Sequence, residues 1–241
     1  MLPCSTAAKK DLIHYYRVKE SKAFVFPNSL PDIEIRNKSN NKKIGFLGRL
    51  DYSKGVDILI EAFTKVLKEI PDAVLEIAGK GSQETELKKT VASFNIKDRV
   101  IFKGAISYGE VLNFLSSVNF LIVPSRSDNL PTVALEAFSV ASPVIGSNAG
   151  GIPDIIIDGF NGLLFENENT EDLSKKIIEL FGNRERRNLM ALNARKTFEE
   201  KYCVDKLPER FEQLLEKEQT KQGKQIPNHK KQVPNKFQIR K

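Results

Sequence analysis

Residues 120–136 read Phe-Leu-Ile-Val-Pro-Ser-Arg-Ser-Asp-Asn-Leu-Pro-Thr-Val-Ala-Leu-Glu, a short apolar strand that passes through a polar loop into a helix beginning near Pro131. Two acids, Asp128 and Glu136, lie on either side of that turn. Open α/β sheets bind ligands outside the carboxyl ends of their strands, and a helix N-terminus offers free N–H groups to an anion. The stretch therefore predicts a site that holds a phosphate by backbone and a hydroxyl-rich sugar by carboxylates.

Strands and helices alternate on both sides of this stretch. Apolar strands are expected at 44–47, 73–78, 100–102, 120–123, 143–146 and 162–165. Helices are expected at 55–70, 82–94 with Ser82 as its cap, 108–117, 131–140, 152–157, 171–182, 185–200 and 205–218. Repeated units of this kind predict an α/β fold, a doubly wound parallel sheet covered on both faces with right-handed crossovers, over residues 43–182.

The first 42 residues differ from this pattern. Ser5 predicts a helix cap, with the helix ending near Tyr16. A short apolar strand is expected at 23–26, and residues 32–42 are polar and have the composition of a linker.

Composition indicates a globular protein, with 40% hydrophobic and 29% charged residues. No apolar run approaches the roughly 18 residues of a membrane-spanning helix, and the N-terminus lacks the pattern of a signal peptide. Disulfide frameworks, metal sites and histidine-dependent catalysis are disfavoured, because the chain has only Cys4, Cys203, His14 and His229 to build them.

The net charge of +7 lies entirely in residues 217–241, which carry eight basic residues and one acid. This segment contains few large apolar residues and is predicted to be disordered. One hypothesis is that it binds an anionic membrane surface. Nucleic acid is a disfavoured partner, because Phe237 is the segment's only aromatic residue and single-strand binding needs several.

Three further turns that follow strands carry residues suited to an anion. Arg49 and Lys54 flank the first helix, and a guanidinium fork with an ammonium suits a diphosphate. Gly-Lys-Gly at 79–81 and Gly-Gly at 150–151 allow backbone to approach a ligand. Each turn also admits a plain interpretation as surface cations or a tight turn, but all four lie at one edge of the sheet.

Taken together, these motifs resemble the C-terminal half of a family 4 glycosyltransferase, a family of retaining enzymes with the two-lobed GT-B fold. The resemblance rests on Gly48-Arg-Leu with Lys54-Gly, on Asp128 with Glu136, and on Ser-Asn-Ala-Gly-Gly-Ile-Pro-Asp at 147–154 followed by Asn-Gly-Leu-Leu at 161–164. It covers about residues 5–215. It implies a remnant of the N-terminal lobe and interlobe linker at 1–42, a Rossmann-like nucleotide-sugar-binding domain at 43–216, and a basic tail at 217–241.

The resemblance implies a role for each motif. Arg49 and Lys54 would hold the donor diphosphate, Asp128 would bind hydroxyls of the donor sugar, and these three would be the catalytic residues. Glu136 would accept hydrogen bonds from the ribose. The other implied donor-binding residues are Gly48, Gly79, Asn129, Leu130, Pro131, Thr132, Val133, Gly150 and Gly151. Two positions depart from the family's usual residues, since Asp128 and Asp154 stand where Glu is usual.

The predicted function is transfer of a hexose, with retention, from a nucleotide-diphosphate sugar to a glycan or lipid-linked acceptor in glycan or polysaccharide synthesis. No metal or cofactor is expected, and a UDP-sugar is the first expectation for the donor, with a GDP-sugar second. Sugar transfer is expected to require an N-terminal lobe supplied as a partner. The alternative is a non-catalytic nucleotide-sugar-binding module or a truncated fragment. The expected location is cytoplasmic, with peripheral contact at the inner face of the membrane through the tail as a variant.

Overall fold

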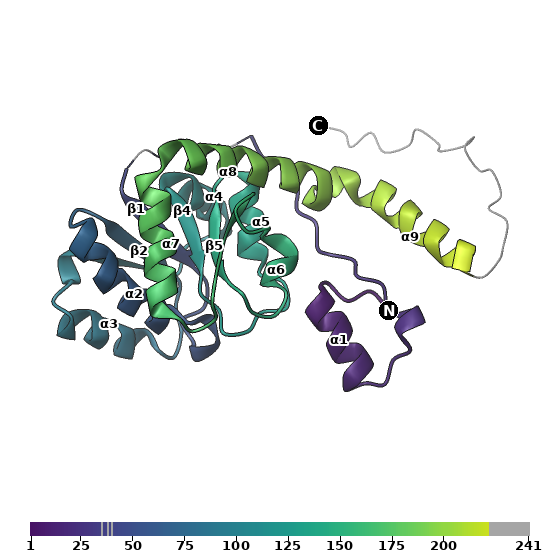
Figure 1. Cartoon of the computed structure of the whole chain (residues 1–241), viewed down its shortest axis with the longest axis horizontal. Coiled ribbons are helices and arrows are strands. Elements are labelled where there is room, and N and C mark those ends of the chain that lie inside the picture. The colour runs from purple at the N-terminus through teal and green to yellow at the C-terminus, as the bar shows by residue number, and fades with distance from the viewer. Residues whose placement is uncertain (35, 38, 40, 222–241) are drawn as a thin grey trace. The chain divides into compact units, whose positions relative to one another are not determined.

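The computed structural model describes residues 1–34, 36–37, 39 and 41–221, with side chains up to residue 216 (Figure 1). It divides into two compact units, Met1–Lys206 and Leu207–Lys241. Within the second unit, helix α9 (Leu207–Lys221) is described, and the rest of the predicted basic tail lies outside the described residues. No helix in the described part of the chain combines the length and apolar character needed to cross a membrane.

Among the described residues, six parallel strands form one sheet in the order β3-β2-β1-β4-β5-β6. The strands are β1 (Lys43–Leu47), β2 (Val74–Ala78), β3 (Val100–Gly104), β4 (Phe120–Val123), β5 (Val144–Ser147) and β6 (Gly162–Phe165). This arrangement confirms the predicted doubly wound α/β sheet. The chain builds outward from β1 to β3 and then returns to the other side of β1, where Ile44 lies opposite Phe120 of β4. The strand order therefore reverses between β1 and β4.

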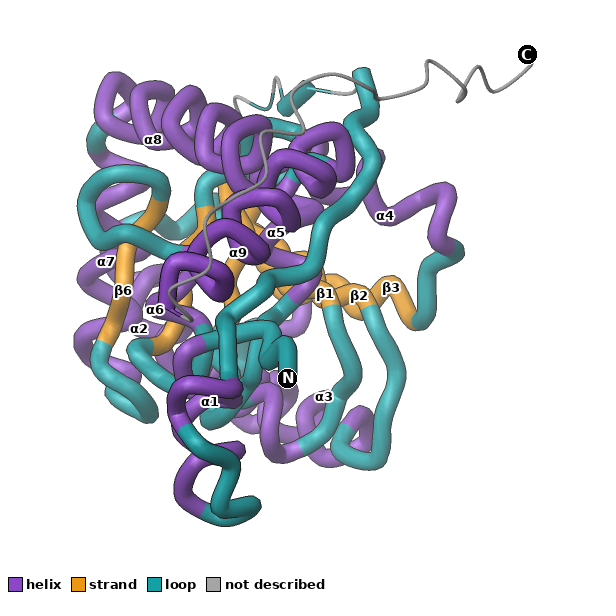
Figure 2. Tube along the Cα trace, turned by 90° about the vertical axis from the view of Figure 1, so that its right-hand side faces the viewer, coloured by secondary structure: helices purple, strands orange, loops and turns teal. Residues whose placement is uncertain are grey.

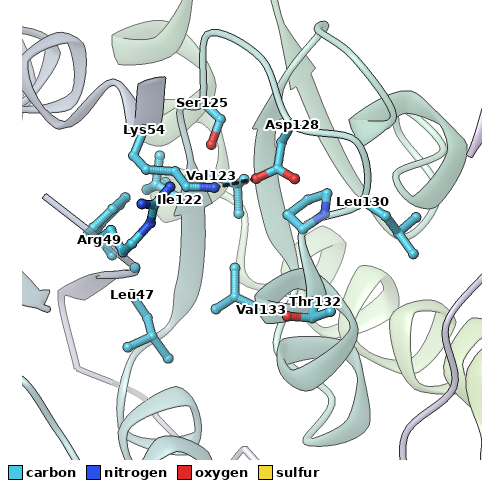
Figure 3. A pocket seen from close by; sticks show the side chains of 13 residues that line it. Leu47, Arg49, Lys54, Ile122, Val123, Ser125, Asp128, Leu130, Thr132 and Val133 are labelled. Atoms are coloured by element: carbon cyan, nitrogen blue, oxygen red, sulfur yellow. Dashed lines mark hydrogen bonds and ion pairs between the residues drawn. The ribbon is translucent and has the colours of Figure 1, made fainter. Parts of the chain in front are cut away.

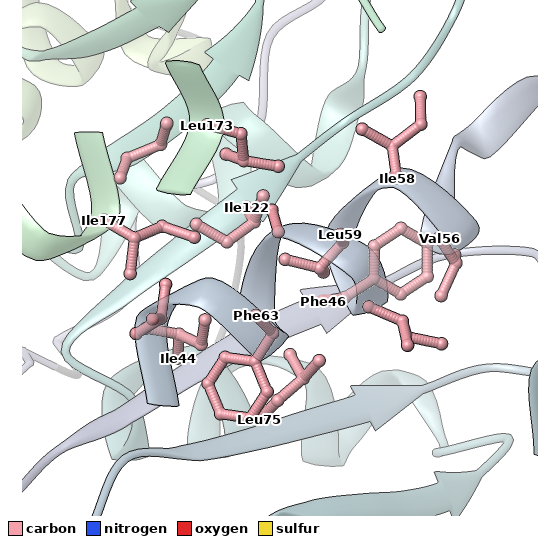
Figure 4. Close-up of a cluster of buried hydrophobic side chains, with 14 of the residues drawn as sticks. Ile44, Phe46, Val56, Ile58, Leu59, Phe63, Leu75, Ile122, Leu173 and Ile177 are labelled. Carbon is pink, nitrogen blue, oxygen red and sulfur yellow. The ribbon is translucent and has the colours of Figure 1, made fainter. Parts of the chain in front are cut away.

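Helices cover both faces of the sheet (Figures 1 and 2). Successive strand residues point to opposite faces, so Phe120 and Ile122 of β4 join one buried cluster while Leu121 and Val123 join another. The first cluster packs against α2 (Val56–Glu69), α3 (Glu84–Ser93) and α7 (Thr170–Gly182) (Figure 4). The second packs against α4 (Tyr108–Ser117), α5 (Thr132–Ser139) and α6 (Ile152–Ile155). Helix α8 (Arg184–Thr197) contributes to both clusters.

The predicted helices agree with the structure apart from their ends. In α2 the apolar residues that recur at helical spacing are mostly buried. Val56, Leu59, Ile60, Phe63 and Val66 are fully buried, whereas Leu67 is partly buried. The prediction of Ser82 as the cap of α3 is wrong, because the N-cap is Gln83. The Gln83 N–H donates to the Leu50 carbonyl at 2.9 Å, so the chain stays tied to the neighbouring loop and turns into a helix only afterwards.

The N-terminal segment packs on the same unit as the sheet. The Ser5 hydroxyl accepts the Ala8 N–H at 3.1 Å and caps α1 (Thr6–His14), as predicted. The predicted strand at 23–26 is wrong. The N–H groups of Phe24 and Phe26 donate to carbonyls of the first three residues, so the segment pairs with the chain's own beginning instead of joining a sheet.

The linker following this segment is anchored to α8. Asp32 forms a two-pronged ion pair with Arg195, at 2.8 and 2.6 Å. The Leu30 N–H donates to the Tyr202 carbonyl at 2.9 Å. These contacts fix residues 30–32 against the C-terminal end of the sheet unit.

Candidate functional site

A cavity of about 280 Å³ opens at the carboxyl ends of β1 and β4, where the strand order reverses (Figure 3). In open α/β sheets this switch point is the place where ligands bind. The walls come from the end of β1 and the loop after it, from the end of β4, and from the loop leading into α5. The lining residues are Phe46, Leu47, Gly48, Arg49, Lys54, Ile122, Val123, Ser125, Asp128, Leu130, Pro131, Thr132 and Val133.

The structure brings Lys54 and Asp128 into direct contact across this cavity. Lys54 ends a short 3-10 turn (Tyr52–Lys54) after β1, whereas Asp128 lies in the loop after β4. The Lys54 Nζ lies 2.6 Å from Asp128 Oδ2, and the two side chains are 24% and 14% exposed (Figure 3). Two groups assigned separately to the diphosphate and the sugar therefore form one partly desolvated ion pair.

Arg49 lines the same cavity but is held loosely. Its side chain is 77% exposed, and its guanidinium lies 3.2 Å from the Asp51 carboxylate. The pKa of Asp51 is lowered, chiefly by a hydrogen bond from the Ser53 hydroxyl and also by the charges of Arg49 and Lys54. Arg49 is thus free to swing toward an anion in the cavity at little cost, because exposed ion pairs contribute little to stability.

The N-terminus of α5 forms the third wall. Pro131 is its N-cap residue, and Thr132 and Val133 open the first turn. The first N–H groups of a helix have no intrahelical acceptor, and the positive end of the helix dipole favours an anion there. Two cations and a helix N-terminus therefore converge on one cavity that also contains a carboxylate.

Four predicted donor-binding residues, Gly79, Asn129, Gly150 and Gly151, do not line the cavity but hold its loops together. A Cβ on Gly79, whose φ is 143°, would lie 1.8 Å from the Gly48 carbonyl oxygen. A Cβ on Gly151 would lie 1.8 Å from the Asn129 oxygen, and the Gly151 N–H donates to the Asp128 carbonyl at 2.7 Å. Glycine is required at both positions because neighbouring backbone occupies the space of a side chain.

Glu136 also lies outside the lining of this cavity. It faces a narrow crevice beside Leu30, Tyr108 and Ser139. Among the described residues no donor bonds its carboxylate, and burial raises the pKa of that carboxyl above its ordinary value of 4.5. A desolvated carboxylate without a partner is available to accept hydrogen bonds from a ligand.

Glu136→Gln is expected to stabilise the ligand-free chain at neutral pH. Because the folded state raises the pKa of Glu136, it binds the proton more tightly than the unfolded state does. The wild type therefore loses stability relative to the variant as the pH rises from 4.5 through the raised pKa. Urea unfolding of both proteins at about pH 4 and about pH 7.5 measures this gap. A gap that is equal at both pH values would contradict the raised pKa.

Sequence reasoning missed several residues of the site. Ser125 and the apolar residues at the ends of β1 and β4 line the cavity, and their position directly at strand ends was a usable signal. The role of Asp154 was also missed, since its carboxylate accepts the Thr6 N–H at the start of α1. No cluster of three or more His, Cys, Asp and Glu side chains suited to a metal occurs within the described ranges.

Comparison with known proteins places this chain in a family. The family model described as glycosyl transferases group 1 matches residues 31–197. A glycosyltransferase of Methanocaldococcus jannaschii is 35% identical over 187 residues, which cover 78% of this chain and 51% of that protein. The chain spans about half the length of the curated relatives it matches.

Two solved structures share the fold. The C-terminal domain of the group 1 glycosyltransferase LpcC from Francisella tularensis is 27% identical, with a TM-score of 0.63, and covers 71% of this chain and 89% of that domain. Anabaena HepE, solved in complex with UDP-glucose, is 21% identical, with a TM-score of 0.79, and covers 90% of this chain and 63% of HepE. With a family match over residues 31–197, the chain belongs to the glycosyl transferases of group 1.

Proposed function

We propose that the cavity between β1 and β4 binds the diphosphate of a nucleotide-sugar donor, and that the protein transfers the sugar, a hexose, with retention of configuration. The observation that supports this most is the convergence of Lys54, Arg49 and the α5 N-terminus on one cavity at the switch point. The family match gives the reaction class. The complex of HepE with UDP-glucose supports a nucleotide-sugar as the donor.

The proposed chemistry follows from where negative charge develops. As the glycosidic bond breaks, charge accumulates on the departing nucleoside diphosphate. Preorganised cations and backbone N–H groups aimed at that charge lower the barrier. Lys54 and Arg49 supply the cations, and the first turn of α5 supplies the N–H groups. In this proposal no metal or other cofactor is needed, because these groups meet the charge themselves.

Donor binding would break the ion pair between Lys54 and Asp128. The incoming diphosphate competes with Asp128 for the Lys54 ammonium, which lies 2.6 Å from the carboxylate without ligand. Once that ammonium turns to the phosphate, the carboxylate can accept hydrogen bonds from sugar hydroxyls. Asp128 then orients the sugar while Lys54 holds the leaving group.

We assign the ribose to Glu136. Its desolvated carboxylate has no bonded donor among the described residues, and ribose hydroxyls are donors of the kind it lacks. Glu136 lies in α5, the helix whose first turn would hold the phosphate. A nucleotide lying along α5 would reach both ends of this arrangement.

The rest of the proposal concerns the whole protein. We place a part of the N-terminal lobe and the interlobe linker at 1–42, the donor domain at 43–216 and a basic tail at 217–241. The match to a C-terminal domain of LpcC supports the assignment of the donor half. The remaining lobe, as a partner, would present a glycan or lipid-linked acceptor in polysaccharide synthesis. The enzyme would be cytoplasmic, with peripheral membrane contact through the tail.

Thermal unfolding with nucleoside diphosphates tests the proposal. A UDP-sugar is the first candidate donor and a GDP-sugar the second, so UDP, GDP and ADP are compared. A ligand at about 100 times its Kd adds about 2.7 kcal/mol to stability, which raises the melting temperature. Glu136→Gln should weaken the binding of UDP but leave the binding of inorganic pyrophosphate unchanged, because pyrophosphate has no ribose. No shift with any nucleotide would contradict the donor site.

Transfer is tested separately from binding. The chain together with its N-terminal lobe should yield a product whose anomeric configuration matches that of the donor, read by proton NMR. Tight binding of UDP without transfer would favour a nucleotide-sugar-binding module instead.

A further inference from the structure

Arg126 ties together the loops that carry the two charged groups of the candidate site. It lies in the loop between β4 and α5, two residues before Asp128, and it does not line the cavity. Its Nη1 and Nη2 donate to the two carboxylate oxygens of Asp57 at 2.9 and 2.7 Å. Its Nε donates to Glu168 at 2.6 Å. The side chain is only 15% exposed.

Arg126 also bonds the turn that carries Lys54. Nη1 also donates to the Tyr52 carbonyl at 2.7 Å, and the guanidinium lies 3.8 Å from the centre of the Tyr52 ring. The Arg126 N–H donates to the Ser53 carbonyl at 2.8 Å. Two consecutive carbonyls of the Tyr52–Lys54 turn are thus bonded to one residue of the Asp128 loop. Lys54, whose ammonium pairs with Asp128, is the residue immediately after Tyr52 and Ser53.

The loop after β6 also bonds Arg126. Glu168 lies after β6 and has φ of 62°, in the left-handed region that residues other than glycine rarely adopt. The Asn167 amide donates to the Arg126 carbonyl at 3.2 Å. Such backbone strain persists only where surrounding contacts fix it, and here Arg126 supplies those contacts.

Arg126 compensates part of the negative charge of the two carboxylates that it bonds, Asp57 and Glu168. Burial alone would raise the pKa of Asp57, but the hydrogen bonds and charge of Arg126 outweigh burial and lower that pKa. The hydrogen bonds to Asp57 in turn raise the pKa of Arg126. Asp57 also occupies the first turn of α2, which begins two residues after the cavity-lining Lys54. Because Arg126 neutralises it, the cavity keeps the positive charge of Lys54 and Arg49 for an anion.

We propose that Arg126 is a positioning residue that holds Lys54 opposite Asp128 and so sets the geometry of the diphosphate site. The inference rests on the proposed function of that site. Arginine is suited to this task because its planar fork donates four side-chain hydrogen bonds to Asp57, Glu168 and the Tyr52 carbonyl, one more than the three donors of a lysine ammonium allow. Misplacing a binding group by an ångström through a distant change costs up to about 100-fold.

A double-mutant cycle on UDP binding tests this role. Arg126→Met is expected to raise the Kd for UDP by about ten- to 100-fold, with Arg126→Lys in between. If Arg126 acts through Lys54, adding Arg126→Met to Lys54→Met should change the Kd by less than about two-fold. Arg186→Met is the matched control, because Arg186 also pairs with an acid, Glu179, away from the cavity. The Kd of the Arg186→Met variant for UDP should equal that of the wild type.

Three results would overturn the proposal. One is an unchanged Kd in Arg126→Met, which would mean that Arg126 only stabilises the fold. Another is a full additional loss in the Lys54→Met background. The third is hydrogen exchange at residues 52–55 of the ligand-free chain that Arg126→Met leaves as slow as in the wild type, because loss of Arg126 should speed exchange there selectively, in contrast to Arg186→Met. Exchange measured without nucleotide still decides the role of Arg126 if the wild type binds no nucleotide and the proposed function fails.

Discussion

Lys54→Met is expected to remove most of the affinity of this chain for a nucleoside diphosphate, a loss of about 2–5 kcal/mol in binding free energy. The Lys54 side chain is only 24% exposed, and its ammonium points across the cavity to Asp128. An anion that enters this cavity loses part of its hydration, and without Lys54 only the exposed Arg49 and the α5 N-terminus remain to replace it. Isothermal titration with UDP measures the loss.

The control must separate binding from folding, because Lys54→Met also leaves Asp128 without its partner at 14% exposure. Adding Asp128→Asn removes that uncompensated carboxylate, so the double variant should regain stability without regaining affinity. Lys65→Met serves as the matched variant. Lys65 lies on α2, the helix that follows the Tyr52–Lys54 turn. Its ammonium donates to Glu171 at 2.8 Å, and it does not line the cavity. Equal UDP affinity in Lys54→Met and Lys65→Met would refute the diphosphate assignment.

The order and type of the elements could be predicted because strand and helix periodicities repeat along this sequence. The strand at 120–123 is apolar throughout, and in the structure every residue of β4 is buried. Such a strand needs cover on both faces, which a parallel sheet with flanking helices gives. Hydrogen bonds between residues that are distant in the sequence could not be predicted. The start of α3 depends on Leu50, and the segment at 23–26 on the first residues of the chain.

The residues of the site could be predicted better than their contacts. That Arg49, Lys54 and Asp128 share one edge follows from their places after parallel strands. That Lys54 reaches Asp128 depends on the Tyr52–Lys54 turn, whose position is set by loop packing rather than by spacing. Arg126 shows the limit most clearly. In the sequence it is one cation in a polar loop, and its partners Asp57, Tyr52, Ser53, Glu168 and Asn167 lie 69, 74, 73, 42 and 41 residues away.

The glycines at the carboxyl edge explain how loops from different strands come close enough to form one cavity. Gly48 follows β1 and Gly79 follows β2, and these two strands are neighbours. The Gly48 N–H donates to the Ala78 carbonyl at 3.1 Å, and the Gly79 N–H donates to the Gly104 carbonyl at 2.7 Å. Backbone-to-backbone contact thus continues past the ends of the strands and supports the wall that carries Arg49.

Gly79→Ala is expected to destabilise the fold by about 3 kcal/mol or more, through backbone strain and overpacking together. The φ of Gly79 is 143°, which residues with a side chain rarely adopt, and the new Cβ would lie 1.8 Å from the Gly48 oxygen. That neighbour is backbone and cannot rotate away, so the loops after β1 and β2 must separate. The cavity should then lose its Gly48 wall, and UDP affinity should fall along with stability.

Urea unfolding of Gly79→Ala and Gly109→Ala makes the comparison, since a Cβ on Gly109 meets nothing within 4 Å. Gly109 lies in the first turn of α4, where alanine lowers the entropy lost on folding and should add up to about 1 kcal/mol of stability. The two substitutions are chemically identical, so any difference comes from their surroundings. A Gly79→Ala protein as stable as the wild type would show that the loops at this edge are not in backbone contact, and the wall of the donor cavity would have to be redrawn.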